Sequence, residues 1–469
     1  MDIATFAEHL TAGRGAVYLA IQQQGLEPYA ETLLDGCLYS SIYSEDFLQE
    51  FERAQWLYPL FAKTPYYSHF DQVIRDAFQP DQDESYDDPH SNQRFALLAL
   101  MALDGDQDAY RLIQYWAERW LAEHDMRRYQ WSEWWLALAG QKALLPIVRG
   151  WGYLVPHLDE FYVPTLERLL ELCHESFTPE QRQISLEQAH ADVQAAATFD
   201  FYIKAYWEYH SAEGQEELAR QQSAQAVQAL TTEQREKRRC ARLRKELPLA
   251  ELLSQARKRR MRNHFTMQLG TCLSLVEQQW VLHQIESEPD EEVAASLLWF
   301  FKRVALPNPL SPKVWQLIKS TNPKVVTAML VVLAQNQHPQ IGAYAREILS
   351  QGQLNKVYAE LIGLFKLNYQ QGDELLIRQV LEHFAEDKDA IHTLGFILND
   401  WVKYQALPAL APLLYWMYEH NPCSMCRGQI VESLEALNAL TPELLRECQY
   451  DVQGETRAWA SKRLSINDV

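Results

Sequence analysis

The sequence predicts an all-α protein, and three observations support this prediction. Apolar residues recur at helical spacing along most of the 469 residues, without a convincing run of strand-like alternation. Glycine is scarce, at 17 residues, which disfavours sandwiches, barrels and nucleotide-binding folds that depend on tight turns. With 47% apolar residues, among them 14 Trp, the chain can bury one or more large cores.

Residues 89–124 show this spacing in the first half of the chain. The sequence PHSNQRFALLALMALDGDQDAYRLIQYWAERWLAEH has two apolar-rich stretches on either side of the turn signal from Asp104 to Asp106. A glycine between acidic residues favours a turn over one longer helix. We expect two helices joined by a short turn, which in outline is one unit of a helical repeat.

The stretch DEEVAASLLWFFKRV, residues 290–304, predicts a complete amphipathic helix. Val293 and Leu297 begin an apolar stripe that continues through the phenylalanines. Asp290 is a suitable N-cap, and the acidic pair after it and the basic pair near the end suit the two ends of the helix dipole.

Further helices of this type follow with minimal connections. They are SPKVWQLIKS from Ser311, NPKVVTAMLVVLA from Asn322, HPQIGAYAREILS from His338 and GETRAWASKRLS from Gly454. Three of them place Pro in the first turn behind a polar residue, where its missing N–H costs nothing. Val293 and Val325 are 32 residues apart, and Ile341 follows after half that interval, 16. Pairs of short helices at such periods are typical of an α-solenoid.

On these residues, the region from about Leu247 to the C-terminus resembles HEAT-type repeats. The resemblance lies in the openings of a polar residue, Pro, one further residue and Val or Ile, and in a closing unit at residues 451–464. It implies an α-α superhelix, that is, a HEAT-like solenoid. The whole chain resembles large bacterial HEAT-repeat proteins of unassigned function, so the resemblance implies no activity.

We expect three segments along the chain. Residues 1–210 form a solenoid-like helical domain, and residues 247–469 form the HEAT-like repeat domain. Between them, residues 211–246 are polar, Gln-rich and basic, without a broad apolar stripe, and predict a solvated connector. The predicted superhelix therefore has two halves joined by a polar basic connector.

A run of basic residues is the first candidate binding site. Residues 235–262 contain twelve Lys or Arg against three Glu, in a chain whose net charge is -20. One interpretation is a site for an anion, a nucleic acid or an acidic partner, because Arg makes bidentate contacts with phosphate and carboxylate. The other is a segment held on acidic faces of its own chain by ion pairs that each contribute little. The candidate residues are Arg244, Lys245, Arg257, Lys258, Arg259, Arg260 and Arg262.

The densest aromatic cluster lies in RRYQWSEWWLALAG, residues 127–140. Its candidate groove residues are Trp131, Trp134 and Trp135, of which Trp131 and Trp135 share a helical face. Packing between helices explains such a cluster, since aromatic side chains bury large areas. A groove for a ligand or a partner is the alternative interpretation.

The segment HNPCSMCRGQ, residues 420–429, has two cysteines at a spacing used by metal sites and by redox pairs. A structural zinc site needs four ligands. The candidate ligands are Cys423, Cys426, Cys448 and His420. A redox pair is the second interpretation, since a cysteine at a helix N-terminus is activated as a thiolate. The third is packing, in which Asn421 and Pro422 start a helix and the cysteines act as small apolar residues.

Seven cysteines, most of them isolated in helical sequence, favour a reducing compartment over a disulfide framework. The N-terminus shows no secretory signal, and the longest apolar stretches are too short to cross a membrane. We therefore expect a cytoplasmic protein that makes no membrane contact.

The sequence predicts a non-enzymatic protein without a cofactor. None of the motifs HExxH, GxSxG, GxGxxG or the P-loop occurs in it. A solenoid offers an extended concave face, so we expect a scaffold or adaptor that binds a protein or peptide. The alternative is nucleic-acid binding through residues 235–262, as in the HEAT-like DNA glycosylases, and the acidic remainder of the chain disfavours it.

Overall fold

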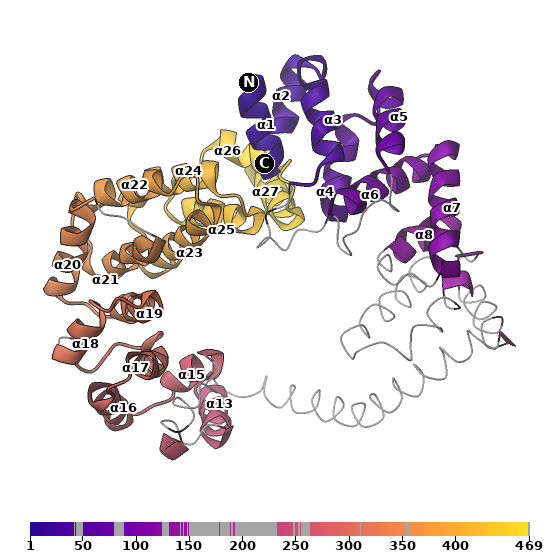
Figure 1. Cartoon of the computed structure of the whole chain (residues 1–469). Helices are drawn as coiled ribbons and strands as arrows, with labels where there is room; N and C mark the ends of the chain where they lie inside the picture. Colours follow the sequence, from indigo (N-terminus) through magenta and orange to yellow (C-terminus); the bar gives the residue numbers. More distant parts are fainter. Residues whose placement is uncertain are drawn as a thin grey trace. The chain divides into compact units, whose positions relative to one another are not determined.

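The computed structural model describes residues 1–41, 43, 50–78, 89–123, 131–140, 232–246, 249–251, 263–309, 311–352 and 356–467, with a few isolated positions between 142 and 254. Every regular element in these ranges is a helix, and they contain no strand (Figure 1). The prediction of an all-α protein is therefore confirmed.

The chain forms two compact units. One consists of Met1–Gln225 together with Arg446–Val469, and the other of Ala226–Leu445. We expected residues 247–469 to form a single domain. The last residues instead pack with the N-terminal helices, so the boundaries of the compact units differ from the expected ones.

The first unit is centred on helix α6. Its elements are α1 (Ile3–Ala12), α2 (Ala16–Gln24), η1 (Glu27–Tyr29), α3 (Ala30–Leu38), α4 (Glu50–Leu57), η2 (Tyr58–Leu60), α5 (Tyr67–Ala77), α6 (Pro89–Leu103), α7 (Gln107–Glu123), α8 (Trp131–Ala139), the end of α26 (Pro442–Cys448) and α27 (Gly454–Asn467). Helix α6 contacts α3, α4, α5, α7 and α8, and most of its side chains are buried. The turn between α6 and α7 contains Gly105 with φ 102°, as the sequence predicts for this pair.

The segment after α26 packs on the first helices of the chain. The Arg14 guanidinium donates from Nε and Nη2 to the two carboxylate oxygens of Glu447, at 2.8 and 3.2 Å, and both side chains are nearly buried. The Val452 amide donates to the Gly13 carbonyl at 2.9 Å, and Trp56 Nε1 donates to the Tyr450 carbonyl at 2.7 Å. Polar contacts between both ends of the chain therefore complete this unit.

Gly15 allows the backbone at Glu447 to approach the start of α2 closely. A Cβ atom at residue 15 would lie 1.9 Å from the Glu447 carbonyl oxygen, which belongs to backbone that cannot easily shift. We expect Gly15→Ala to lower the free energy of unfolding of the first unit by about 1–3 kcal/mol, the usual cost of overpacking. Urea unfolding, with amide exchange across residues 446–452, would measure the loss.

The control is Gly454→Ala, whose Cβ would meet only Arg457 Nη2, at an ordinary 3.6 Å. This variant should unfold like the wild type. If the Gly15 and Gly454 variants were equally stable, the close approach of the Glu447 backbone to Gly15 would not contribute to stability.

The second unit is a succession of short helices. They are α13 (Thr232–Glu246), η6 (Leu249–Glu251), α15 (Asn263–Gly270), α16 (Leu275–Ser287), α17 (Glu291–Leu298), η7 (Trp299–Phe301), α18 (Pro312–Leu317), α19 (Pro323–Leu333), α20 (Pro339–Ser350), η8 (Lys356–Leu364), α21 (Phe365–Asn368), α22 (Asp373–His383), α23 (Lys388–Tyr404), η9 (Pro408–Leu410), α24 (Ala411–His420) and α25 (Ser424–Ala436).

Several of these helices begin where their caps predict. The side chains of Asp290, Asn322 and His338 accept hydrogen bonds from the first-turn amides of α17, α19 and α20. Val293 and Val325 are buried, as the apolar stripe requires. The helix predicted to run through residue 304 is shorter, because α17 ends at Leu298 and tightens into the 3₁₀ helix η7.

The helices of the second unit contact one another in alternation. Helix α17 contacts α19, α19 contacts η8, η8 contacts α23, and α23 contacts α25. Between them in sequence, α16 contacts α18, α20 contacts α22, and α22 contacts α24. Helices that are not consecutive in the chain are therefore neighbours in space (Figure 1).

Several polar contacts in this unit join residues that are 30 to 34 positions apart in the chain. Asn322 Nδ2 donates to Glu292 across 30 residues, Asn368 Nδ2 to the Asn336 carbonyl across 32, and Ser433 Oγ to Asn399 Oδ1 across 34. These separations match the 32-residue period of the apolar stripe. Each such bond fixes the position of one helix against the helix one period earlier.

Candidate functional site

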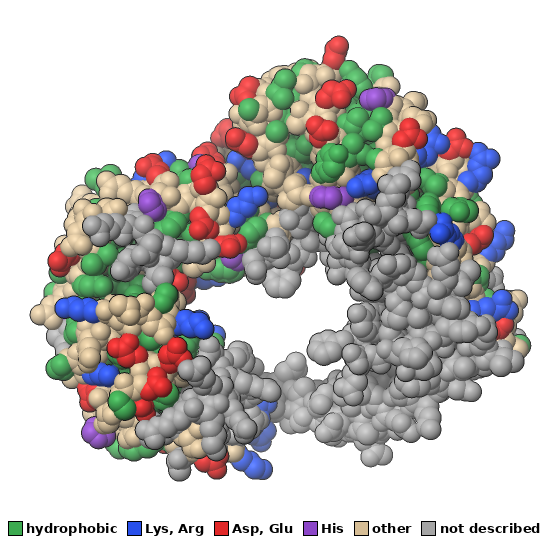
Figure 2. Space-filling view, in the orientation of Figure 1, with side chains coloured by type: hydrophobic (Ala, Val, Ile, Leu, Met, Phe, Trp, Pro, Cys, Tyr) green, Lys and Arg blue, Asp and Glu red, His purple; other side chains and the backbone are tan. Residues whose placement is uncertain are grey.

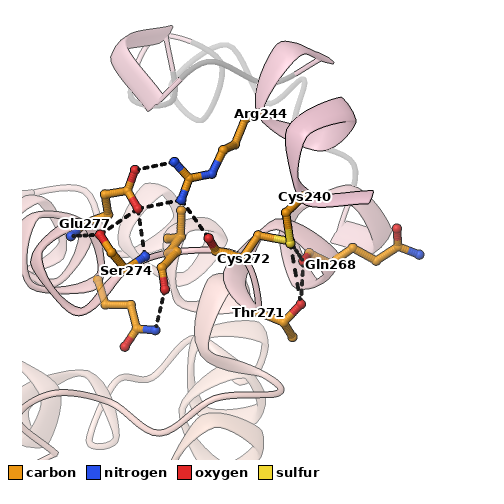
Figure 3. A network of polar contacts seen from close by, with 9 residues as sticks. Cys240, Arg244, Gln268, Thr271, Cys272, Ser274 and Glu277 are labelled. Carbon is orange, nitrogen blue, oxygen red and sulfur yellow. Dashed lines mark hydrogen bonds and ion pairs between the residues drawn. A yellow bond between two sulfur atoms is a disulfide. The ribbon is translucent and has the colours of Figure 1, made fainter. Parts of the chain in front are cut away.

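A disulfide joins the basic helix α13 to the turn before α16. Cys240 on α13 and Cys272 have Cα atoms 5.3 Å apart and bonded sulfurs, and they are 32 residues apart in sequence (Figure 3). Cysteine usage in the sequence favoured a reducing compartment over a disulfide framework, and this pair departs from that expectation. Sequence reasoning missed it because pairing depends on how α13 packs, which no local pattern specifies.

An ion pair beside the disulfide makes a second connection. Arg244 Nη1 and Nη2 donate to the two carboxylate oxygens of Glu277 at 2.9 and 2.8 Å, and Nη2 also donates to the Cys272 carbonyl at 2.7 Å (Figure 3). Ser274 caps α16, and its backbone amide and hydroxyl both donate to Glu277. Partial burial alone would raise the pKa of Glu277, but the hydrogen bonds from Ser274 and the charge of Arg244 hold it below its ordinary value.

The other basic residues of α13 whose side chains the structure describes differ in their exposure to solvent. Arg239 is half-buried, pairs with Glu236 at 2.6 Å and donates to the Thr271 hydroxyl. Four others are exposed to solvent, namely Lys237, Arg238, Arg242 and Lys245. Acidic, basic and hydrophobic side chains are interspersed over the described part of the face in Figure 2. Five candidate residues, Arg257, Lys258, Arg259, Arg260 and Arg262, lie outside the described residues.

Exposed apolar side chains lie on α16 next to this ion pair. Leu275, Val276 and Trp280 are 62%, 74% and 39% exposed. Val276 and Trp280 are four residues apart and therefore share a face of the helix, on either side of Glu277 in sequence. A basic helix fixed beside an exposed apolar face is a surface that can bind an amphipathic segment. We call the exposed residues of α13 and α16 the α13–α16 surface.

The tryptophans of α8 belong to the core of the first unit. Trp135 is buried and its ring lies 6.0 Å from that of Tyr110, and the half-buried Trp134 packs 5.8 Å from Phe51. The side chain of Trp131 lies outside the described residues. Packing between helices accounts for the two described tryptophans.

The CxxC cysteines approach a histidine from another helix. Cys423 is the N-cap residue of α25 and Cys426 lies in its first turn, and both are fully buried. Cys426 Sγ is 3.5 Å from Nδ1 of His392 on α23, and donor atoms of all three residues lie within 4.8 Å of one another. The arrangement can hold a metal ion or form a thiol–imidazole hydrogen bond.

This donor set differs from the predicted one. His420 is exposed, stacks on Trp416 with ring centroids 3.9 Å apart and bonds the Trp416 carbonyl through Nδ1. Cys448 is buried and belongs to the other compact unit. Among the described residues, the group that could hold an ion is His392 with Cys423 and Cys426. His392 stands 34 residues before Cys426, close to the repeat period, and that period is the signal that could have found it.

The predicted start of this helix also needs correction. Pro422 does not begin α25, which starts at Ser424. Asn421 Oδ1 instead accepts from the Cys423 amide at 3.0 Å and so shapes the loop before the helix.

Comparison with protein-family models, curated proteins and solved structures found no match. Among the described helices, none has the length and apolar character needed to cross a membrane.

The disulfide gives a prediction about α13. Cys240→Ser should lower the free energy of unfolding of the second unit by about 3–4 kcal/mol, from the loop entropy of a 32-residue separation. At neutral pH the Arg244 ion pair still holds α13, so its amide exchange should rise only moderately. The pKa of Glu277 is lower in the folded protein than its ordinary value of 4.5. The stabilisation by its ion pair with Arg244 is therefore fully present above pH 4.5, and it is lost as the pH falls through the lower pKa of the folded state. After correction for the intrinsic pH dependence of amide exchange, the protection of α13 in Cys240→Ser should therefore fall sharply on acidification.

Peptide mapping of unreduced protein checks the premise. It should recover Cys240 and Cys272 in one cross-linked fragment. Cys448→Ser, a buried cysteine of the first unit, is the control that should leave exchange in α13 unchanged. Recovery of Cys240 and Cys272 as separate thiols would refute the prediction.

Proposed function

We propose that this protein is a helical-repeat interaction protein that binds an acidic, amphipathic segment of a partner protein on its α13–α16 surface. The observation that supports the proposal is the exposed apolar face of α16 beside the exposed cations of α13. An apolar surface rimmed by charge is typical of sites that bind a peptide helix.

We also propose that the second unit is an α-solenoid of the HEAT type. The alternating helix contacts and the polar contacts spaced by 30, 32 and 34 residues support this architecture. In a solenoid each repeat contacts only its neighbours, which leaves extended surfaces for binding.

The apolar residues would supply most of the affinity. Full burial of a side chain such as Val or Leu contributes about 1.5–3 kcal/mol, so three such side chains contribute at most about 4.5–9 kcal/mol before the entropic costs of association. The cations at the rim would select an acidic partner and speed its association. Because the whole chain carries a net charge of -20, this local positive surface also sets where such a partner can approach.

Site-specific photo-crosslinking tests the proposal. A photoreactive amino acid at residue 276 or 280, in the native cells, should capture the same protein at both positions. The matched control is residue 375 on α22, where Leu is 69% exposed but no basic helix has been described beside it. Capture at all three positions alike would argue against a specific surface.

A peptide from the captured protein then allows a quantitative test. Its binding, followed by fluorescence anisotropy, should weaken at least about tenfold in Val276→Glu, whereas Leu375→Glu should bind normally. Lys245→Glu should slow association and reduce its salt dependence.

Nucleic-acid binding is the competing function, and single-stranded DNA is the probe for it. Tight DNA binding that falls steeply with salt, is lost in Lys245→Glu and is unaffected by Val276→Glu would overturn the proposal in favour of nucleic acid.

A further inference from the structure

The cluster of Cys423, Cys426 and His392 is independent of the α13–α16 surface and has its own chemistry. Zinc is the common divalent ion of cells that prefers sulfur and imidazole ligands, and this cluster offers two thiols and one imidazole. Both cysteines are fully buried, and His392 is the member of the cluster that is partly exposed to solvent. Its members come from α23 and from the start of α25, which hold them without help from a mobile loop.

The distances agree with tetrahedral zinc. Zn–S bonds of about 2.3 Å and Zn–N bonds of about 2.0–2.1 Å at the tetrahedral angle place sulfur and nitrogen about 3.5 Å apart. Cys426 Sγ and His392 Nδ1 are 3.5 Å apart. The donor atom of the third residue, Cys423, lies within 4.8 Å of both.

The surrounding residues fix the two helices in this register. Asn421 receives the Cys423 amide on Oδ1 and donates from Nδ2 to the carbonyl of Ile391, the neighbour of His392, at 3.4 Å. This side chain therefore connects the loop before the cysteines to the helix of the histidine. Gly395 makes room for it, because a Cβ there would lie 2.6 Å from Asn421 Nδ2.

A buried arginine holds the other side of the loop. Arg427 is fully buried and its Nη1 donates to the carbonyls of Asn421 and Pro422, at 3.2 and 3.3 Å. Both carbonyl groups immediately precede Cys423. The loop is therefore shaped before any ion arrives, which lowers the ordering cost of binding.

We infer that Cys423, Cys426 and His392 bind one zinc ion, with a fourth position open to water on the His392 side. On binding, the two thiols release their protons to solvent and the neutral imidazole donates a lone pair, so the ion is held by two thiolates and one nitrogen. Among the described residues no fourth His, Cys, Asp or Glu joins the group. Three protein ligands and an open position are typical of zinc sites that bind an exogenous ligand, whereas purely structural sites have four.

The first experiment measures metal in full-length protein purified without a histidine tag or chelator. We expect one zinc per chain, and after removal and cobalt loading, thiolate-to-cobalt charge-transfer absorption with the visible bands of a tetrahedral site. Wild-type protein without stoichiometric zinc and without the charge-transfer absorption would overturn the inference. So would isolation of Cys423 and Cys426 as a disulfide under reducing conditions.

Matched variants then locate the ion. Cys426→Ser and His392→Gln should each weaken zinc binding at least about a hundredfold, beyond what loss of an outer-shell partner costs. Their controls, Cys448→Ser and His420→Gln, remove the ligands that the sequence alone had suggested and should bind zinc normally. Equal zinc content in the ligand variants and the controls would refute the assignment.

Gly395→Ala tests whether zinc binding depends on the position of Asn421, because it leaves all three proposed ligands unchanged. It should displace Asn421 and weaken zinc binding roughly ten- to a hundredfold while the cobalt spectrum keeps its charge-transfer bands. Gly363→Ala is the control, since its Cβ would make only ordinary contacts of 3.6 and 3.8 Å. Circular dichroism of each variant separates loss of the ion from loss of the fold.

Discussion

The short helices of the second unit bury their apolar residues largely against helices that are not consecutive with them in the chain, and the rest of that unit depends on this packing. This packing explains why polar side chains meet at separations of 30, 32 and 34 residues. It also brings chemically useful groups together. The disulfide spans 32 residues, and the contact between Cys426 and His392 spans 34.

The helices themselves were predictable because their signals are local. Proline behind a polar residue marked the starts of α19 and α20, and the acidic turn around Gly105 separated α6 from α7. These signals depend on the backbone of a few adjacent residues, so the sequence alone carries them. The start of α25 was placed too early, because Asn421 bonds the Cys423 amide instead of capping a helix at Pro422.

The candidate sites were less predictable because they depend on packing across one repeat. Cys423 and Cys426 could be named from their spacing, but the third donor could not be chosen between histidines without knowing that α23 contacts α25. Arg244 was named from charge alone, whereas its partner Glu277 and the adjacent disulfide follow from the position of α13. The exposed apolar residues of α16 gave no signal, since exposure is a property of the folded chain.

The contact of Arg14 with Glu447 joins residues 433 positions apart, and it has a consequence for synthesis on the ribosome. At about 5–20 residues per second, the first helices wait roughly 20–90 seconds before the segment that completes their unit emerges. The second unit lies wholly between these two segments in sequence, so all of its residues are made before the first unit can close. The N-terminal helices thus lack part of their packing surface for most of translation.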